Sequence, residues 1–126
     1  MARFLSADWV TDLATAAGDV RVEDSVDVTV QQVVVDGPGD PVRWALRVTD
    51  GRVLVVAGGV PDPDVTVTTA LPTAVALARG EVAVTDAFMG GRLRIAGDLR
   101  ALLRAGVVLG ALDAAFAAVR DQTTWD

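Results

Sequence analysis

Five stretches of the chain have the pattern of β-strands, at residues 25–35, 42–49, 52–57, 65–69 and 92–96, and in all but the third hydrophobic and polar positions alternate with a period of two. This alternation predicts β-strands that bury one face and expose the other. Asp50-Gly51, between the second and third stretches, is a dipeptide that two-residue hairpin turns prefer. The third stretch is apolar on both faces, which indicates deeper burial or a covered edge.

Elsewhere the apolar residues recur three or four positions apart, as they do in amphipathic helices. Ser6 is a candidate N-cap for a helix that runs to about residue 17. A second helix follows Thr69, its expected N-cap, and ends at Gly80. The remaining helical segments are a short turn at 85–89, a helix after Asp98 and a last helix at 107–120.

A run of strands with helices at both ends is typical of an α+β fold with a mostly antiparallel sheet. We therefore expect five strands in one sheet that helices cover on one face. The 126 residues suit a single domain, 1–126, large enough to bury roughly two-thirds of its unfolded surface. The sequence contains neither an internal repeat nor a low-complexity linker.

Charge and composition narrow the function classes. With 17 acidic and 11 basic residues the net charge is −6, which disfavours a nucleic-acid partner and electrostatic docking on an anionic membrane. The chain has no Cys and no His, so disulfides and thiolate chemistry are excluded. The absence of His also removes the side chain that most often acts as a general base and as a transition-metal ligand.

The first residues lack the apolar run of a signal peptide, and no window reaches the roughly 18 apolar residues of a membrane span. We therefore expect a cytoplasmic protein without stable membrane insertion. The basic residues are all Arg, and Ala, Val, Gly and Asp are abundant, which indicates a GC-rich bacterial genome.

The loop carboxylates do not suggest a metal site. Asp residues are common beside Gly or Pro in turns, which is the setting of Asp36, Asp40, Asp62 and Asp64. Their spacing fits no known metal-binding loop. No combination of residues supports a catalytic mechanism. We expect no catalytic residue, no metal and no cofactor.

Residues 87–98 carry a more specific pattern, in which a helical turn, two glycines, an alternating strand and a helix cap follow one another. Asp64-Val65-Thr66-Val67-Thr68 and Leu77-Ala78-Arg79-Gly80-Glu81 precede it. With these segments the chain resembles the sterol carrier protein type 2 (sterol-binding domain) family. The signature positions that match are Ala87, Phe88, Gly91, Arg92, Leu93, Arg94, Ile95, Gly97 and Asp98.

The resemblance implies an apolar cavity between the sheet and the helices that accommodates sterols, fatty acids or fatty acyl-CoA. We therefore expect non-catalytic binding or transfer of a hydrophobic ligand. Strand parity and the matched segment suggest as cavity lining Trp9, Leu13, Trp44, Leu46, Leu77, Phe88, Met89, Leu102, Leu103, Leu112 and Phe116.

A second hypothesis is a protein-interaction module that forms a homodimer and fills the cavity with its own side chains. The Ala-rich helix at 107–120 suggests it, although that helix could also be a lid over the cavity or pack plainly on the domain. An enzyme that holds a hydrophobic substrate in the cavity is disfavoured. Trp125, close to the C-terminus, is expected to be exposed.

Overall fold

Five strands form the main sheet of the computed structural model, which describes residues 2–18, 20–37, 39–98, 100–101, 103–104 and 113–125. They are β2 (Val28–Val35), β3 (Val42–Thr49), β4 (Arg52–Ala57), β5 (Val65–Ala70) and β6 (Leu93–Gly97). Their order is β4-β3-β2-β5-β6, and all neighbours are antiparallel except β2 and β5. The predicted α+β fold with a five-stranded, mostly antiparallel sheet is confirmed.

The turn between β3 and β4 is the predicted two-residue hairpin. Asp50 and Gly51 have φ angles of 53° and 76°, both in the left-handed region. A type I′ turn requires positive φ at both central residues, and its twist matches that of the flanking strands. The dipeptide therefore fixes the register of this hairpin.

A crossing loop at residues 58–64 accounts for the parallel pair. The side-chain oxygen of Gln31 accepts a hydrogen bond from the Val60 N–H at 2.9 Å. The Thr29 carbonyl accepts another from the Asp64 N–H at 2.9 Å. The loop thus runs back along β2 on the sheet face that carries Thr29 and Gln31, the outer face. Because it returns to the starting end of β2 before β5 begins, β5 points the same way as β2.

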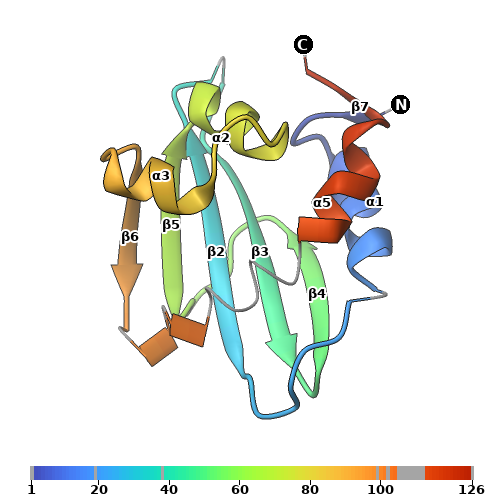
Figure 1. The fold of residues 1–126 in the computed structure, drawn as a ribbon, viewed down its shortest axis with the longest axis vertical. Helices are drawn as coiled ribbons and strands as arrows, with labels where there is room; N and C mark the ends of the chain where they lie inside the picture. The colour runs from blue at the N-terminus through green and yellow to red at the C-terminus, as the bar shows by residue number, and fades with distance from the viewer. Residues whose placement is uncertain are drawn as a thin grey trace.

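Helices α1 (Ala7–Ala17) and α5 (Asp113–Arg120) lie side by side (Figure 1). The helix α1 begins as predicted, because the Ser6 hydroxyl accepts a hydrogen bond from the Trp9 N–H at 3.2 Å. The helix predicted at 107–120 is thus present over its second half. Its first residues belong to the segment 105–112, which lies outside the described residues.

Helices α2 (Leu71–Ala78) and α3 (Val84–Met89) lie near β5 and β6 (Figure 1). The predicted cap of α2 is wrong: the N-cap is Ala70, and no side chain caps the helix. The helix begins one residue later than predicted, because β5 continues through Ala70 and runs directly into Leu71.

The hydrophobic periodicity of the sequence did not predict two short strands. β1 (Ala2–Arg3) and β7 (Thr123–Thr124) form a separate parallel pair that joins the two ends of the described chain. The Ala2 N–H donates to the Gln122 carbonyl and the Phe4 N–H to the Thr124 carbonyl, both at 2.9 Å. Two residues are too few for an alternating pattern, so sequence periodicity cannot detect such a pair.

The core lies on the inner face of the sheet, the face opposite Thr29 and Gln31. Val30, Leu46 and Val65 on three neighbouring strands are fully buried there. Helix α1 contributes Trp9 and Leu13 to the same cluster. Parity thus predicts the inward side chains of β2 and β3 correctly, although Thr29 on the outer face is buried as well. The expectation that residues 52–57 are deeply buried or covered is wrong, because β4 is an edge strand on which Leu54 and Val56 are exposed.

Candidate ligand-binding groove

An apolar groove lies at one end of the inner face of the sheet. It has a volume of about 640 Å³ and three walls: the β2–β3 hairpin end, helix α2, and the segments next to β1 and β7. Its apolar lining consists of Phe4, Leu5, Val34, Val42, Leu71, Val75 and Trp125. Arg3, Ser6, Gly37, Gly39 and Asp40 complete it.

Local structure explains why two of these walls are apolar. Val34 and Val42 are paired directly across β2 and β3, so both side chains point to the same face. Leu71 and Val75 are four residues apart on α2 and therefore share one side of that helix. The sheet and the helix thus each present an aliphatic pair to the groove.

The third wall depends on an unusual backbone at Leu5. Its φ of 66° lies in the left-handed region, which costs a residue with a side chain about 1–3 kcal/mol. This conformation turns the chain between β1 and the N-cap Ser6, where the Ser6 N–H donates to the Arg3 carbonyl at 3.0 Å. The tight turn brings Phe4 and Leu5 to the groove.

Aromatic rings connect the groove with the core. The ring centroids of Trp125 and Phe4 lie 5.1 Å apart, and those of Phe4 and Trp9 lie 4.9 Å apart in an edge-to-face arrangement. Trp9 meets Trp44 at 5.5 Å, and Trp44 meets Phe116 at 6.5 Å. Such pairs contribute about 0.5–1.5 kcal/mol each beyond the area they bury. Five of the six aromatic residues of the chain therefore form one continuous row from the groove to α5.

Four predicted lining residues belong to the packed interior instead of an open cavity. Trp9, Leu13, Trp44 and Leu46 are all buried in the core cluster. Leu77 and Phe116 are partly buried against the same cluster. The structure places these six residues in or against one cluster between the sheet and the helices, and contact of a ligand with them stays a prediction.

Three other predicted residues face solvent. Phe88 is 47% exposed, Met89 79% and Leu103 70%. Small residues close to them in the sequence are buried instead: Ala87 in α3, and Ala101, two positions before Leu103. A helix of so few residues has no periodic pattern that fixes which side is buried. Leu102 and Leu112 lie outside the described residues.

None of the predicted lining residues that the structure describes lines the groove. The expectation that Trp125 is exposed is wrong, because its side chain is half-buried, packed on Phe4 and covered by Arg79. The sequence pattern placed the groove residues Val34 and Val42 on the inner face of their strands. Helical spacing likewise placed Leu71 and Val75 on the buried side of their helix. The sequence carried no signal that these two pairs meet the chain ends.

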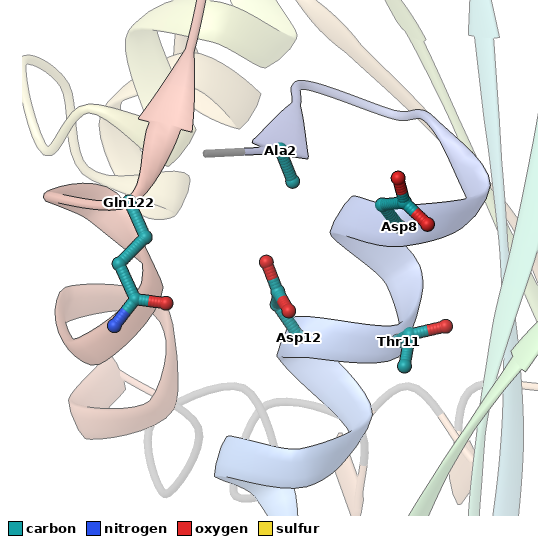
Figure 2. A pocket seen from close by; sticks show the side chains of 5 residues that line it. All are labelled: Ala2, Asp8, Thr11, Asp12 and Gln122. Carbon is teal, nitrogen blue, oxygen red and sulfur yellow. The ribbon is translucent and has the colours of Figure 1, made fainter.

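A second hollow, of about 510 Å³, lies between α1 and the turn before β7. Figure 2 shows Asp8 and Asp12 on α1, with Thr11 on the same helix, Ala2 on β1 and Gln122 across from them. Its lining is mainly polar, so it does not suit an apolar ligand. Within the described ranges no group of three or more His, Cys, Asp or Glu residues is placed to hold a metal ion. Nor does any described helix have the length and apolar character to cross a membrane.

Comparisons with known structures agree with the fold. A conserved hypothetical protein of Thermus thermophilus, possibly a sterol carrier protein, matches with a TM-score of 0.71 and 16% identity, covering 98% of this chain and 92% of that one. Palmitated sterol carrier protein 2-like 2 of Aedes aegypti matches with a TM-score of 0.63 and 23% identity, covering 81% of this chain and 94% of that one. The inverting sec-alkylsulfatase of Pseudomonas sp. matches with 0.53 and 23%, covering 82% of this chain but 14% of the enzyme.

A search of curated protein sequences found no relative. The family model described as the SCP-2 sterol transfer family matches residues 28–110, about two-thirds of the chain. This range contains β2 to β6, the helices α2 and α3, and two walls of the groove. The chain therefore belongs to the SCP-2 sterol transfer family.

Proposed function

We propose that residues 1–126 act as one non-catalytic domain that binds a hydrophobic ligand in the groove and transfers it through the open side. The observation that carries this proposal is a groove with three apolar walls in a member of a sterol transfer family. Burial of ligand surface against these walls contributes about 25 cal/mol per Å² before the ordering costs of binding.

The names of two relatives favour an alkyl chain as the ligand. The Aedes aegypti protein is described as palmitated, and the Pseudomonas enzyme is named for an alkyl sulfate. We therefore propose a fatty acid or fatty acyl-CoA before a sterol or isoprenoid-like lipid. In this proposal Trp9 and Trp44 support the groove from behind Phe4. Contact of a ligand with Phe88, Met89 or Leu103 stays a prediction.

The first test is native mass spectrometry of the gently purified protein, followed by solvent extraction and lipid identification. A stoichiometric adduct with the mass of a fatty acid or another apolar lipid is the expected result, and it would name the ligand class. A bare protein that also fails to take up a fluorescent fatty acid would contradict the proposal.

A pair of variants locates the site. Val75→Trp fills the groove from α2, whereas Val56→Trp adds the same ring to the exposed outer face of β4. We expect Val75→Trp to weaken binding of the fluorescent fatty acid by about tenfold or more, a loss of roughly 1.4 kcal/mol, and Val56→Trp to leave it unchanged. Circular dichroism and thermal unfolding check that both variants are folded. Equal affinity of the two variants would place the ligand elsewhere.

The dimerising module remains the competing hypothesis. The filled interior around Leu13 and Leu46 is compatible with it, because those side chains leave no room for a ligand beside them. Light scattering after size exclusion, together with uptake of an apolar dye, separates the two. A dimer that excludes the dye favours the module, and a dye-binding monomer favours the carrier.

A further inference from the structure

The strand β6 forms an open edge of the main sheet. Among the described residues only β5 pairs with it, and Figure 1 shows no other element on its far side. An edge strand presents unpaired N–H and C=O groups to which a further strand can bind. Arg92 and Arg94, which match the sequence signature, lie at this edge and do not line the groove. The most specific motif of the chain thus includes a surface that the proposed function does not use.

The hydrogen bonds to β5 show which backbone groups of β6 point to the open side. The Asp98 N–H donates to the Asp64 carbonyl at 3.2 Å, and these two residues continue the register of the pair. In an antiparallel pair such hydrogen-bonded positions recur at every second residue. The intervening residues Leu93, Ile95 and Gly97 therefore direct their N–H and C=O groups away from β5.

The two ends of β6 carry opposite charge. Arg92 and Arg94 at its start are exposed, and within the described part of the chain neither guanidinium has a carboxylate partner. Asp98 follows the end of the strand and is exposed as well. Its Oδ1 accepts a hydrogen bond from the Arg100 N–H at 2.7 Å, which leaves Oδ2 for another donor. An antiparallel partner with the same charge order is therefore complementary to this edge.

We infer that β6 pairs antiparallel with β6 of a second copy of this chain, about a two-fold axis at Ile95. In this register Ile95 lies opposite Ile95 of the second copy, and Leu93 lies opposite Gly97. All three residues that point to the open side then exchange backbone hydrogen bonds, and the two sheets become one. The inference is independent of the proposed function, because β6 contributes no residue to the groove.

The same register opposes unlike charges. Arg92 lies opposite Asp98 of the second copy, and the two-fold axis repeats this pair at the other end of the interface. Arg94 lies opposite Ala96, which is small enough for the arginine stem to pack over it. A register centred on Arg94 would oppose two arginines. A register centred on either Arg94 or Ala96 would also use only two of the three open-side residues of each strand.

Exposed apolar side chains flank β6 on both sides in the sequence. Phe88 and Met89 precede the strand, and Leu103 follows it. Antiparallel pairing brings the start of one β6 beside the end of the other. The segment that holds Phe88 and Met89 therefore comes to the same end of the paired strands as the segment that holds Leu103 of the second copy.

Sedimentation velocity of the full-length protein over a range of concentrations tests the dimer. We expect a dissociation constant of about 100 μM, because pairing of one short strand buries less than the roughly 1,200 Å² of a stable interface. A monomer at every concentration overturns the inference, and so do species larger than a dimer, because a two-fold pairing is closed. Uptake of an apolar dye in the same samples separates the two proposals. A dye-binding monomer overturns only the dimer, and a dimer that excludes the dye contradicts only the groove.

A charge exchange tests the opposed pair. Arg92→Glu and Asp98→Lys should each weaken self-association by about tenfold, because each places like charges opposite one another. An equimolar mixture of the two variants should recover the association, since both cross-strand pairs are then of unlike charge. Asp98→Asn keeps a side-chain oxygen for the helix cap and should weaken association by about threefold. Arg52→Glu on β4, the opposite edge of the sheet, is the matched control and should have no effect. No recovery in the mixture, or an equal loss in Arg52→Glu, overturns the assignment.

Single cysteines determine the register, because the chain contains none of its own. Ile95→Cys should form a disulfide-linked dimer in a glutathione redox buffer, since directly opposed Cα atoms lie about 5.5 Å apart. Arg94→Cys and Ala96→Cys should link much more slowly, because each cysteine is then diagonal to its copy at about 8 Å. Leu54→Cys on β4 measures linkage by random collision. Faster linkage at 94 or 96 than at 95, or equal linkage at 54 and 95, overturns the register.

Discussion

Gly97 lies where β6 ends beside the first residue of β5, and its backbone has a φ of 137°. This region of φ is open to glycine and strained for other residues. A Cβ built at this position would collide with the Asp64 carbonyl and come within 2.9 Å of the Val65 Cα. Glycine is needed here because a backbone segment, not a movable side chain, occupies the space.

Gly97→Ala should therefore lower the free energy of unfolding by about 2–4 kcal/mol. Gly39→Ala is the control, because Gly39 has an ordinary φ and no atom within 4 Å of its built Cβ. That change should shift stability by less than about 0.5 kcal/mol. Urea denaturation followed by tryptophan fluorescence measures both. Similar values for the two variants would refute the role of Gly97.

At the scale of elements, α1 shows how one cap positions several core residues. The Ser6 hydroxyl satisfies one of the free N–H groups at the helix start, and Trp9, Leu13 and Ala17 follow on the buried side. The exposed side carries Thr15, whose hydroxyl donates to the Thr11 carbonyl at 3.0 Å. The cap and the buried side thus agree on where the helix begins and how it is oriented.

Ser6→Ala should cost about 1 kcal/mol of stability, because the Trp9 N–H loses its side-chain acceptor. Ser6→Asp should retain most of that stability, since a carboxylate accepts the same hydrogen bond at a helix N-terminus. Thr15→Ala on the exposed side should be neutral or slightly stabilising, because Ala has the higher helix propensity. Thermal unfolding of the three variants distinguishes the cap from general effects of substitution on this helix.

At the scale of the whole molecule, burial assigns opposite roles to residues of the same type. Leu13 on α1 is completely buried between the helix and the sheet, whereas Leu54 on β4 points from the outer face and is 54% exposed. The core cluster also contains residues of α5 and the described chain ends, including Val119 and Ala2. It therefore connects elements from both ends of the chain with the sheet.

Leu13→Ala should destabilise the protein by about 2–5 kcal/mol, the cost of removing buried methyl groups and leaving a cavity. Leu54→Ala removes the same atoms from a mostly exposed position and should cost less than about 0.5 kcal/mol. Chemical denaturation of both variants measures the difference. Comparable losses would mean that Leu54 is covered in solution, as expected if the outer face were a dimer interface.

The sequence by itself determined the features that depend on neighbouring residues. The period of two predicted which side of β2 and β3 is buried, because side chains alternate along a strand whatever lies beside it. Asp50-Gly51 predicted its turn, and Ser6 its cap, because both act within a few residues of backbone. The order of the five strands along the chain, and with it the α+β class, followed from the same local signals.

Only the tertiary structure decided where the groove forms that we propose for the ligand. The groove joins residues from the N-terminal turn, the β2–β3 hairpin, α2 and Trp125, and no local pattern links segments so far apart. The pairing of β1 with β7 brings the last of these into place, and its two-residue strands have no periodicity. Likewise, residues that parity marked as cavity lining became packed core, since burial fixes only the side a residue faces. Whether the space on that side stays open depends on the volume of the side chains from every element that meets there.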